Sequence, residues 1–193
     1  MISCVVLTAG ESRRFGSPKA LAPVGEENAL VHIQNTLLSS TIDEIIVVLG
    51  AESERIKPHV FNHTKVRLVH NKDYKLGQTS SFQTGVSAVD AFCRGIMLFP
   101  VDCPWILSST VDELIAAFNV RNPDILLPVY KGQRGHPPVF NASLKRDILN
   151  MSPEHGLNTL FASHHPLTEE VNDPGIIKTF NTPDEFNRIQ ARP

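Results

Sequence analysis

An apolar strand runs directly into a short loop that carries three cationic side chains and two glycines. The apolar run covers residues 2–7, and the loop TAGESRRFGSPK follows at residues 8–19. Glycine lets backbone N–H groups approach anionic oxygens closely, while arginine and lysine neutralise the charge of those oxygens. A buried strand that ends in such a loop predicts a polyphosphate site, and therefore chemistry that involves a nucleotide.

The spacing of the glycines excludes two familiar phosphate loops. A Walker loop needs lysine directly after its second glycine, whereas here Lys19 comes three residues after Gly16. The dinucleotide fingerprint G-x-G-x-x-G needs glycine where Ser12 stands, which also argues against a nicotinamide-dependent dehydrogenase. The pattern that remains, from Gly10 to Lys19, is G-x-S-x-R-x-G-x-x-K.

Composition excludes several further classes of protein. The chain has 193 residues, of which 41% are apolar, and this suits one domain over residues 1–193. A formal charge of −2 argues against a nucleic-acid binder, which would show a basic excess. No apolar run reaches the ~18 residues that a membrane span needs. The 3 cysteines lie far apart without C-x-x-C spacing, so neither a zinc site nor a disulfide framework is indicated, and we expect a cytoplasmic protein.

Strand and helix patterns alternate along the chain. Apolar runs predict strands at residues 2–7, 44–49, 65–70, 95–99, 124–129, 136–140 and 176–180. Helical spacing of apolar residues predicts helices at residues 29–38, 53–61, 80–92, 110–118, 144–149 and 157–163, and a last one that starts at Thr182. The alternation predicts an α/β fold of Rossmann-like type, a single domain with a mainly parallel twisted sheet flanked by helices.

The predicted sheet brings the cationic loop and a distant carboxylate to one edge. Ligands of such sheets bind beyond the carboxyl ends of the strands, where the loop at residues 8–19 and Asp102 both lie. Asp102 stands between Pro100 and Pro104, so its loop is stiff. A carboxylate that faces a phosphate loop is a natural Mg²⁺ ligand. A turn residue that caps the next helix explains this segment equally well.

The loop pattern resembles the signature L-x-A-G-x-S-x-R-M-G-x-x-K of nucleotidyltransferases that act on molybdenum cofactor. The closer match is the CTP-dependent molybdenum cofactor cytidylyltransferases and their MobA-like relatives. Further segments that resemble family motifs follow in the family's order: residues 71–86, the D-x-P at residues 102–104, GHPPVF at residues 135–140, and residues 182 onward. The resemblance implies a nucleotide-diphospho-sugar transferase-like fold and Mg²⁺-dependent transfer of CMP from CTP to a phosphorylated acceptor, molybdopterin cofactor, with release of pyrophosphate.

The resemblance also implies roles for individual residues. Arg14, Lys19 and Asp102 are the expected catalytic residues: the two cations neutralise the triphosphate and the leaving pyrophosphate, and Asp102 binds Mg²⁺. The implied nucleotide-binding residues are Leu7, Ala9, Gly10, Glu11, Ser12, Arg14, Gly16, Lys19, Asn71, Gly77 and Ser81. Ser80 and Ser81 have an alternative use as helix caps, in a capping box Ser80-x-x-Gln83.

The acceptor side is implied by the GHPPVF segment. Arg134 could pair with an anionic acceptor and His136 could donate a hydrogen bond to its phosphate. His136 could equally be a structural histidine held by a backbone carbonyl.

The C-terminal motif departs from the family pattern. Where the family commonly has D-I-D-T-P-E-D, this chain reads TFNTPDE at residues 179–185 and lacks both aspartates of the motif. Asn181 can still offer a neutral oxygen to Mg²⁺, and Asp173 is a possible substitute from upstream.

Two other functions stay open at this stage. The acceptor could be a sugar phosphate, a lactyl phosphate or an alcohol phosphate. The chain could also bind nucleotide or cofactor without turnover, as a carrier or chaperone for a molybdoenzyme.

Overall fold

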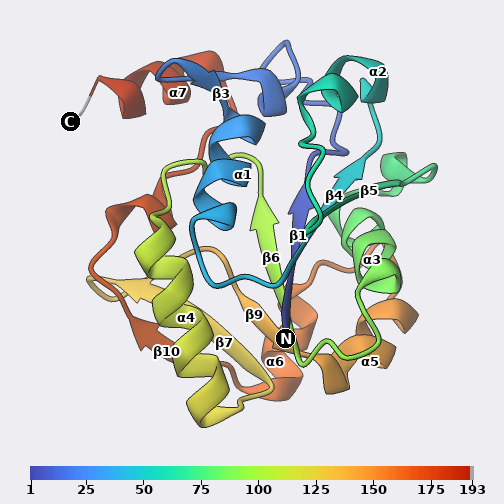
Figure 1. The fold of residues 1–193 in the computed structure, drawn as a ribbon, viewed down its shortest axis with the longest axis vertical. Helices are drawn as coiled ribbons and strands as arrows, with labels where there is room; N and C mark the ends of the chain where they lie inside the picture. Colours follow the sequence, from blue (N-terminus) through green and yellow to red (C-terminus); the bar gives the residue numbers. More distant parts are fainter. Residues whose placement is uncertain (192–193) are drawn as a thin grey trace.

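Eight strands form one central sheet in this computed structural model, which describes residues 1–191 (Figure 1). The strand order is β10-β7-β9-β6-β1-β4-β5, with β8 beside β7. Only β8 and β9 run antiparallel to their neighbours within the described residues. The strands are β1 (Ile2–Leu7), β4 (Glu44–Leu49), β5 (Val66–His70), β6 (Gly95–Pro100), β7 (Ile125–Tyr130), β8 (Gln133–Arg134), β9 (Val139–Asn141) and β10 (Leu167–Glu170). The predicted mainly parallel sheet is confirmed.

Helices cover both faces of this sheet. Their bounds are α1 (Ala29–Leu38), α2 (Ser53–Ile56), α3 (Gln78–Ala88), α4 (Ser108–Arg121), α5 (Lys145–Asn150), α6 (Asn158–His164) and α7 (Pro183–Gln190). In Figure 1, α1 and α4 lie in front of the sheet. A separate small ribbon pairs β2 (Pro23–Val24) with β3 (Glu27–Asn28).

Alternation along β1 builds a core on each face. Successive strand residues point to opposite sides of a sheet. Cys4 and Val6 pack into the cluster that includes α1 and α4, whereas Val5 and Leu7 pack into the one that includes α3, α5 and α6. A strand covered on both faces must be apolar throughout, which is why β1 reads as a continuous apolar run.

The strand register aligns the ends that matter for function. Leu7, the last residue of β1, lies opposite Val48 of β4 and Pro100 of β6. The segments that follow β1 and β6 therefore leave the sheet at the same edge. This register brings residues 8–19 close to Asp102.

One predicted strand is wrong, and four strands were missed. Residues 176–180 do not pair with the sheet: a 3-10 turn, Pro174–Ile177, opens this segment, because the Asp173 side chain accepts the Gly175 N–H at 2.7 Å. Ile176 and Phe180 are nevertheless buried, and their backbones bond to His136 and Asp102 outside the strand pairs of the sheet. The longest missed strand is β10, which pairs with β7 in parallel although two of its residues are glutamates. The others, β2, β3 and β8, have only two residues each.

Several predicted element bounds also need correction. The strand predicted at residues 136–140 is β9 and starts only at Val139, because Pro137 and Pro138 have no N–H to donate. The helix predicted at residues 80–92 starts at Gln78, with Gly77 as its N-cap residue, so the capping box that starts at Ser80 is wrong. The helix predicted at residues 53–61 is α2 followed by a 3-10 turn, Lys57–His59, that contains Pro58.

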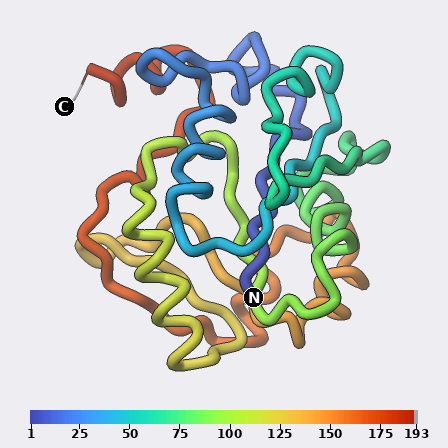
Figure 2. Tube along the Cα trace, in the orientation of Figure 1, coloured from blue at the N-terminus to red at the C-terminus, as the bar shows by residue number. Residues whose placement is uncertain are grey.

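The C-terminal segment packs against the segment that follows β1. Figure 2 shows the red C-terminal segment alongside the blue N-terminal segment. Phe15 packs against Phe180 and Phe186 with ring centroids 5.1 and 5.7 Å apart, respectively. These aromatic contacts fix the C-terminal segment over the loop at residues 8–19.

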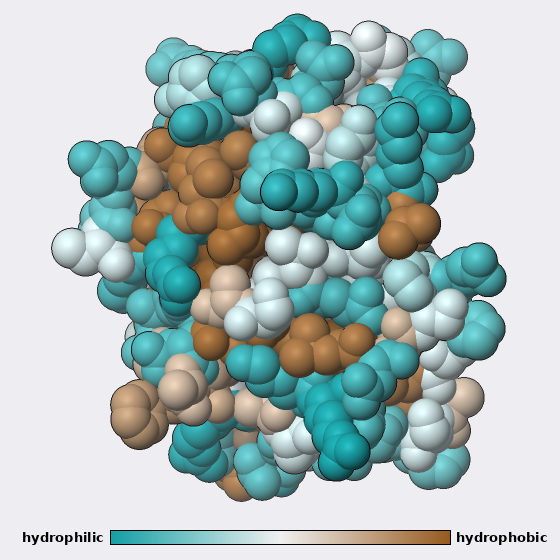
Figure 3. Space-filling view, turned by 90° about the vertical axis from the view of Figure 1, so that its right-hand side faces the viewer, coloured by the Kyte–Doolittle hydropathy of each residue, from teal (hydrophilic) through white to brown (hydrophobic). Residues whose placement is uncertain are grey.

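Apolar and hydrophilic areas alternate on the side of the molecule that carries β5 (Figure 3), where Leu68 of this edge strand is exposed.

Candidate active site

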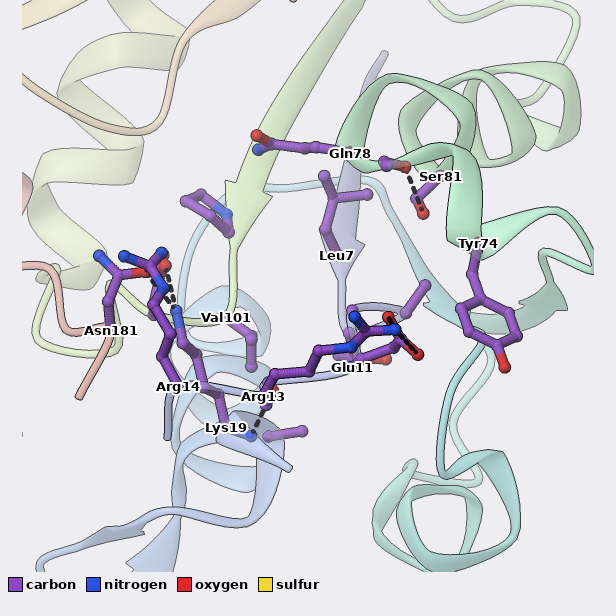
Figure 4. Close-up of a pocket in the computed structure, with 18 of the residues that line it drawn as sticks. Leu7, Glu11, Arg13, Arg14, Lys19, Tyr74, Gln78, Ser81, Val101 and Asn181 are labelled. Atoms are coloured by element: carbon purple, nitrogen blue, oxygen red, sulfur yellow. Dashed lines mark hydrogen bonds and ion pairs between the residues drawn. The ribbon is translucent and has the colours of Figure 1, made fainter. Parts of the chain in front are cut away.

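A cavity of about 540 Å³ opens at the carboxyl edge of β1 and β6 (Figure 4). The loop after β1 forms one side of it, and the first turn of α3 forms another. Its wall contains most of the residues expected at the nucleotide, together with the expected metal ligands Asp102 and Asn181 and the expected acceptor residue His136. The nucleotide residues in the wall are Leu7, Ala9, Gly10, Glu11, Ser12, Arg14, Lys19, Gly77 and Ser81. Gly16, Asn71 and Arg134 lie outside this wall.

Three side chains from distant parts of the sequence meet at one end of the cavity. The Lys19 Nζ lies 3.0 Å from Asp102 Oδ2 and 2.9 Å from Asn181 Oδ1. The Arg14 guanidinium donates to the same Asn181 oxygen at 3.1 Å. The side chains of Lys19 and Asp102 are only 14% and 25% exposed, so their ion pair is partly shielded from water. The expected meeting of the cationic loop with Asp102 is thereby confirmed.

The loop takes its shape from Ser12. This residue has a φ of 51°, a left-handed conformation that is uncommon for serine. Its carbonyl accepts the N–H groups of Phe15 and Gly16, and its hydroxyl accepts the Lys19 N–H at 3.1 Å. Ser12 thus closes the loop and fixes where the Lys19 side chain starts.

Asn71 supports the wall from behind. Asn71 is buried, and its Nδ2 donates to the hydroxyls of Ser80 and Ser81 at 3.0 Å each. Its Oδ1 accepts the backbone N–H of Asp73. Of these residues only Ser81 also lines the cavity. The structure therefore gives Asn71 a supporting contact with the first turn of α3.

His136 has an imidazole nitrogen without a partner. Its Nδ1 is buried and makes no hydrogen bond within the part of the chain that the structure describes. Only its backbone is held, because its N–H donates to the Ile176 carbonyl at 2.9 Å. Burial lowers the pKa of His136, and the Asp102 carboxylate partly opposes this. The ring is thus favoured in its neutral form.

A second cavity of about 590 Å³ adjoins the first. His136 and Thr179 line both cavities, whereas Arg134 lines only the second. The rest of its wall combines apolar residues with the polar Gln133 and Asn158; the apolar ones include Leu127, Pro138, Phe161, Ile176 and Ile177. Two neighbouring cavities that share a wall suit a reaction between two bound molecules.

Residues 174–181, here called the C-terminal strap, cross between the two cavities. The strap is held by the Phe180 N–H, which donates to the Asp102 carbonyl at 3.3 Å. A Cβ at Gly135 would lie 2.4 Å from the Ile176 carbonyl oxygen, so this approach needs glycine. At its end, the Asn181 N–H donates to the Glu185 carboxylate at 2.6 Å, next to the capping box that Glu185 forms with Thr182. The strap therefore positions Asn181 beside Lys19.

Asp173 is not a metal ligand, and that prediction is wrong. Its carboxylate accepts hydrogen bonds from the Leu107 N–H, the Thr110 hydroxyl and the Gly175 N–H at 2.9, 2.8 and 2.7 Å. The residue is buried and lines neither cavity. A carboxylate that already accepts three hydrogen bonds inside the protein fastens the strap to the start of α4.

The donor atoms beside Lys19 fit a Mg²⁺ ion that arrives with phosphate. Mg²⁺ takes oxygen donors, usually one or two carboxylates together with substrate phosphates. Asp102 offers one carboxylate and Asn181 an amide oxygen. Within residues 1–191 there is no cluster of three or more His, Cys, Asp or Glu side chains that could hold a metal by itself.

Sequence reasoning missed some residues of the site. Gln78 and Thr179 line the first cavity; both lie within segments that resemble family motifs, but neither was predicted as a site residue. Gly50, directly after β4, contacts the loop so closely that a Cβ there would lie 2.7 Å from the Ala9 carbonyl oxygen. A glycine that directly follows an apolar strand was the available signal for this close approach.

Comparison with known proteins agrees with this geometry. The sequence profile of the MobA-like NTP transferase domain matches residues 4–167. The chain belongs to this family. It is 28% identical to the molybdenum cofactor cytidylyltransferase of Escherichia coli (strain K12) over 198 residues, which cover 99% of this chain and 96% of that protein. It is 30% identical to the nicotine blue oxidoreductase of Paenarthrobacter nicotinovorans over 156 residues, which cover 75% of this chain and 72% of that protein.

Solved structures show the same fold. The Rv0371c protein of Mycobacterium tuberculosis H37Rv superposes with a TM-score of 0.86 at 22% identity and covers 100% of both chains. Another structure of that protein is described as a complex with manganese. A nucleotidyl transferase from Methanothermobacter has a TM-score of 0.83 at 21% identity and covers 99% of this chain and 96% of its own. These structures share the fold of this chain, and membership of the MobA-like NTP transferase family identifies it as a nucleotidyltransferase. None of the helices within residues 1–191 has the length and apolar character to cross a membrane.

Proposed function

We propose that the protein transfers CMP from CTP to the terminal phosphate of a molybdopterin-type cofactor and releases pyrophosphate. The observation that carries the proposal is the meeting of Lys19, Asp102 and Asn181 beside the glycine loop, next to a second cavity. Cations beside a glycine loop suit a triphosphate, and an adjoining cavity suits the molecule that receives the nucleotide.

In this proposal the loop binds the nucleotide along its length. Arg14 and Lys19 neutralise the triphosphate and the charge that develops on the leaving pyrophosphate. Backbone groups of residues 7–10 contact the base. Leu7, Ala9 and Gly10 all line the cavity, which supports this part of the proposal. Catalysis then comes mainly from positioning and electrostatics.

The acceptor occupies the second cavity. Arg134 pairs with its anionic group, and the neutral His136 ring donates a hydrogen bond to its phosphate at the junction of the two cavities. An ionised phosphate attacks the α-phosphorus in line, and the bond to pyrophosphate breaks. The nucleophile is already deprotonated, so no residue is needed as a general base.

Asp102 would hold Mg²⁺, with Asn181 as a neutral oxygen donor. When bound, the ion supplies charge neutralisation between phosphate oxygens. Similarity to the E. coli cytidylyltransferase over nearly the whole chain favours CTP and the molybdopterin acceptor, and we place the activity in the cytoplasm.

Pyrophosphate release is the direct test. The protein is incubated with Mg²⁺, each of CTP, GTP, ATP and UTP, and molybdopterin, a sugar phosphate or an alcohol phosphate in turn. We expect release only with CTP and molybdopterin. Release with another acceptor overturns the proposed acceptor but leaves nucleotidyl transfer in place.

Two further readouts separate the remaining functions. Thermal shifts with the four nucleotides report which one binds the folded protein. Selective stabilisation by a nucleotide without pyrophosphate release under any acceptor would favour a carrier. Oxidation of NADH or NADPH is also followed, because one relative is named an oxidoreductase. We expect none, since Ser12 stands where the dinucleotide fingerprint needs glycine.

A further inference from the structure

The Lys19 ammonium contacts both of the oxygen donors that a divalent cation would use. It donates to Asp102 Oδ2 at 3.0 Å and to Asn181 Oδ1 at 2.9 Å. The other carboxylate oxygen of Asp102 faces the buried Cys103 thiol, whose Sγ lies 3.7 Å away. Both carboxylate oxygens of Asp102 therefore already have a partner within the protein.

The charges around these donors also disfavour a free cation. Arg14 donates to the same Asn181 oxygen at 3.1 Å, so two cationic side chains converge there. Asn181 itself carries no charge. The partly shielded Lys19–Asp102 pair adds no net charge, and like charges at close range repel strongly where water is excluded.

We propose that Lys19 keeps divalent cations off Asp102 until a nucleotide binds, so that cation and nucleotide bind together. This inference rests on the proposed function for the identity of the nucleotide. A triphosphate offers Lys19 several anionic oxygens in exchange for one carboxylate oxygen. When the ammonium moves to the phosphate, Asp102 becomes available to a cation that the phosphates also bind.

Binding linkage makes the proposal quantitative. If CTP raises the affinity for the cation by some factor, the cation raises the affinity for CTP by the same factor. Removal of the Lys19 charge has opposite effects on the two ligands: it frees Asp102 for the cation, and it takes a partner from the phosphate. A merely structural role for Lys19 would weaken both.

The experiment measures Mn²⁺ binding by electron paramagnetic resonance without any nucleotide. The wild-type protein should bind Mn²⁺ weakly, and Lys19→Gln should bind it about tenfold more tightly or better. Binding of CTP to Lys19→Gln, measured by calorimetry, should become weaker. Arg55→Gln is the matched control, because Arg55 pairs with Glu52 at 3.2 Å and both residues lie outside the first cavity. It should leave Mn²⁺ binding unchanged.

Two further variants keep the outcome decisive. In a Lys19→Gln background, Asp102→Asn should abolish the gained Mn²⁺ binding, which locates the ion. If Lys19→Gln fails to fold, Asn181→Asp supplies a second carboxylate at the same oxygen position and should also raise Mn²⁺ binding. Circular dichroism spectra check the fold of each variant.

Equal Mn²⁺ binding by wild type and Lys19→Gln would overturn the inference. Tight binding of Mn²⁺ to the wild-type protein without any nucleotide would overturn it as well. The proposed function fails on a different observation, namely no CTP binding and no pyrophosphate release by the wild-type protein. Because the Mn²⁺ measurement contains no nucleotide, the two failures are distinguishable.

Discussion

Two segments from opposite ends of the chain contact the same residue, Asp102, one at its carboxylate and the other at its backbone carbonyl. The loop at residues 8–19 contacts Asp102 through the Lys19 side chain, and the C-terminal strap contacts it through the Phe180 backbone. The loop can be recognised in the sequence by its charged residues and its glycines. The strap carries no comparable pattern and was predicted as a strand. The difference teaches that binding chemistry is visible in residue types, whereas positioning depends on contacts that residue types do not specify.

The largest expected effect is a loss of turnover when the contact between the loop and Asp102 is removed. Lys19→Ala or Asp102→Ala should lower turnover by well over tenfold, because one electrostatic contact to a developing charge contributes about 2.7–4 kcal/mol. Pyrophosphate release under saturating substrates measures it. Near-normal turnover in either variant would remove that residue from the catalytic group.

Gly135→Ala tests the contribution of the C-terminal strap by disturbing its packing. The new Cβ would lie 2.4 Å from the Ile176 carbonyl oxygen, so the strap must shift, at a cost of about 1–3 kcal/mol in unfolding free energy. Urea unfolding measures the loss. Gly156→Ala is the matched control, since a Cβ there meets no atom within 4 Å and should change stability little. Equal stability of the two variants would show that the strap adapts freely.

A smaller effect concerns how the strap ends. The Asn181 N–H bond lowers the pKa of Glu185. A lowered carboxyl pKa means stability that is present above the unfolded pKa of about 4.3 and lost as pH falls through the folded value. Glu185→Gln should therefore lower Tm at pH 7, and its difference from wild type should shrink below pH 4. A constant difference over this range would exclude the charge as the cause.

His136, where the strap borders both cavities, should make the stability of the protein depend on pH. Burial lowers its pKa, so the unfolded chain binds its proton more readily than the folded protein does. Stability should fall as pH decreases below the unfolded value of about 6.5, until the folded value is reached. His136→Gln should lose this part of the slope in thermal melts between pH 7 and 5. An unchanged slope would mean that other groups cause it.

The last prediction is that two unfolding transitions, one followed by fluorescence and one by circular dichroism, do not differ. If residues 1–193 form one domain, as we propose, the loop, the strap and the sheet should unfold together. Trp105 is the single tryptophan and lies 5.8 Å from the Phe180 ring, so its fluorescence reports the strap region. Its urea transition should coincide with that of circular dichroism. An earlier fluorescence transition would show that the strap region opens separately.

The sequence predicted the sheet well where strands are buried on both faces. β1, β4 and β6 are continuous apolar runs, because helices cover them on both sides. β10 was missed because its exposed glutamates hide the pattern. The site residues of the loop were found because phosphate chemistry demands their types, whereas Gln78 and Thr179 could be any residues with a suitable position.

By itself, the sequence determined the fold class, the family and the phosphate-binding character of the loop at residues 8–19. Local charge and apolar spacing suffice for these features, since they depend on residues close together in the chain. Only the tertiary structure decided that Asp173 fastens α4, that Asn181 bonds Lys19, and that His136 borders two cavities. Asp173 and Leu107 are 66 positions apart in the sequence, and Lys19 and Asn181 are 162 positions apart. The order of residues along the chain does not say which side chains that far apart come into contact.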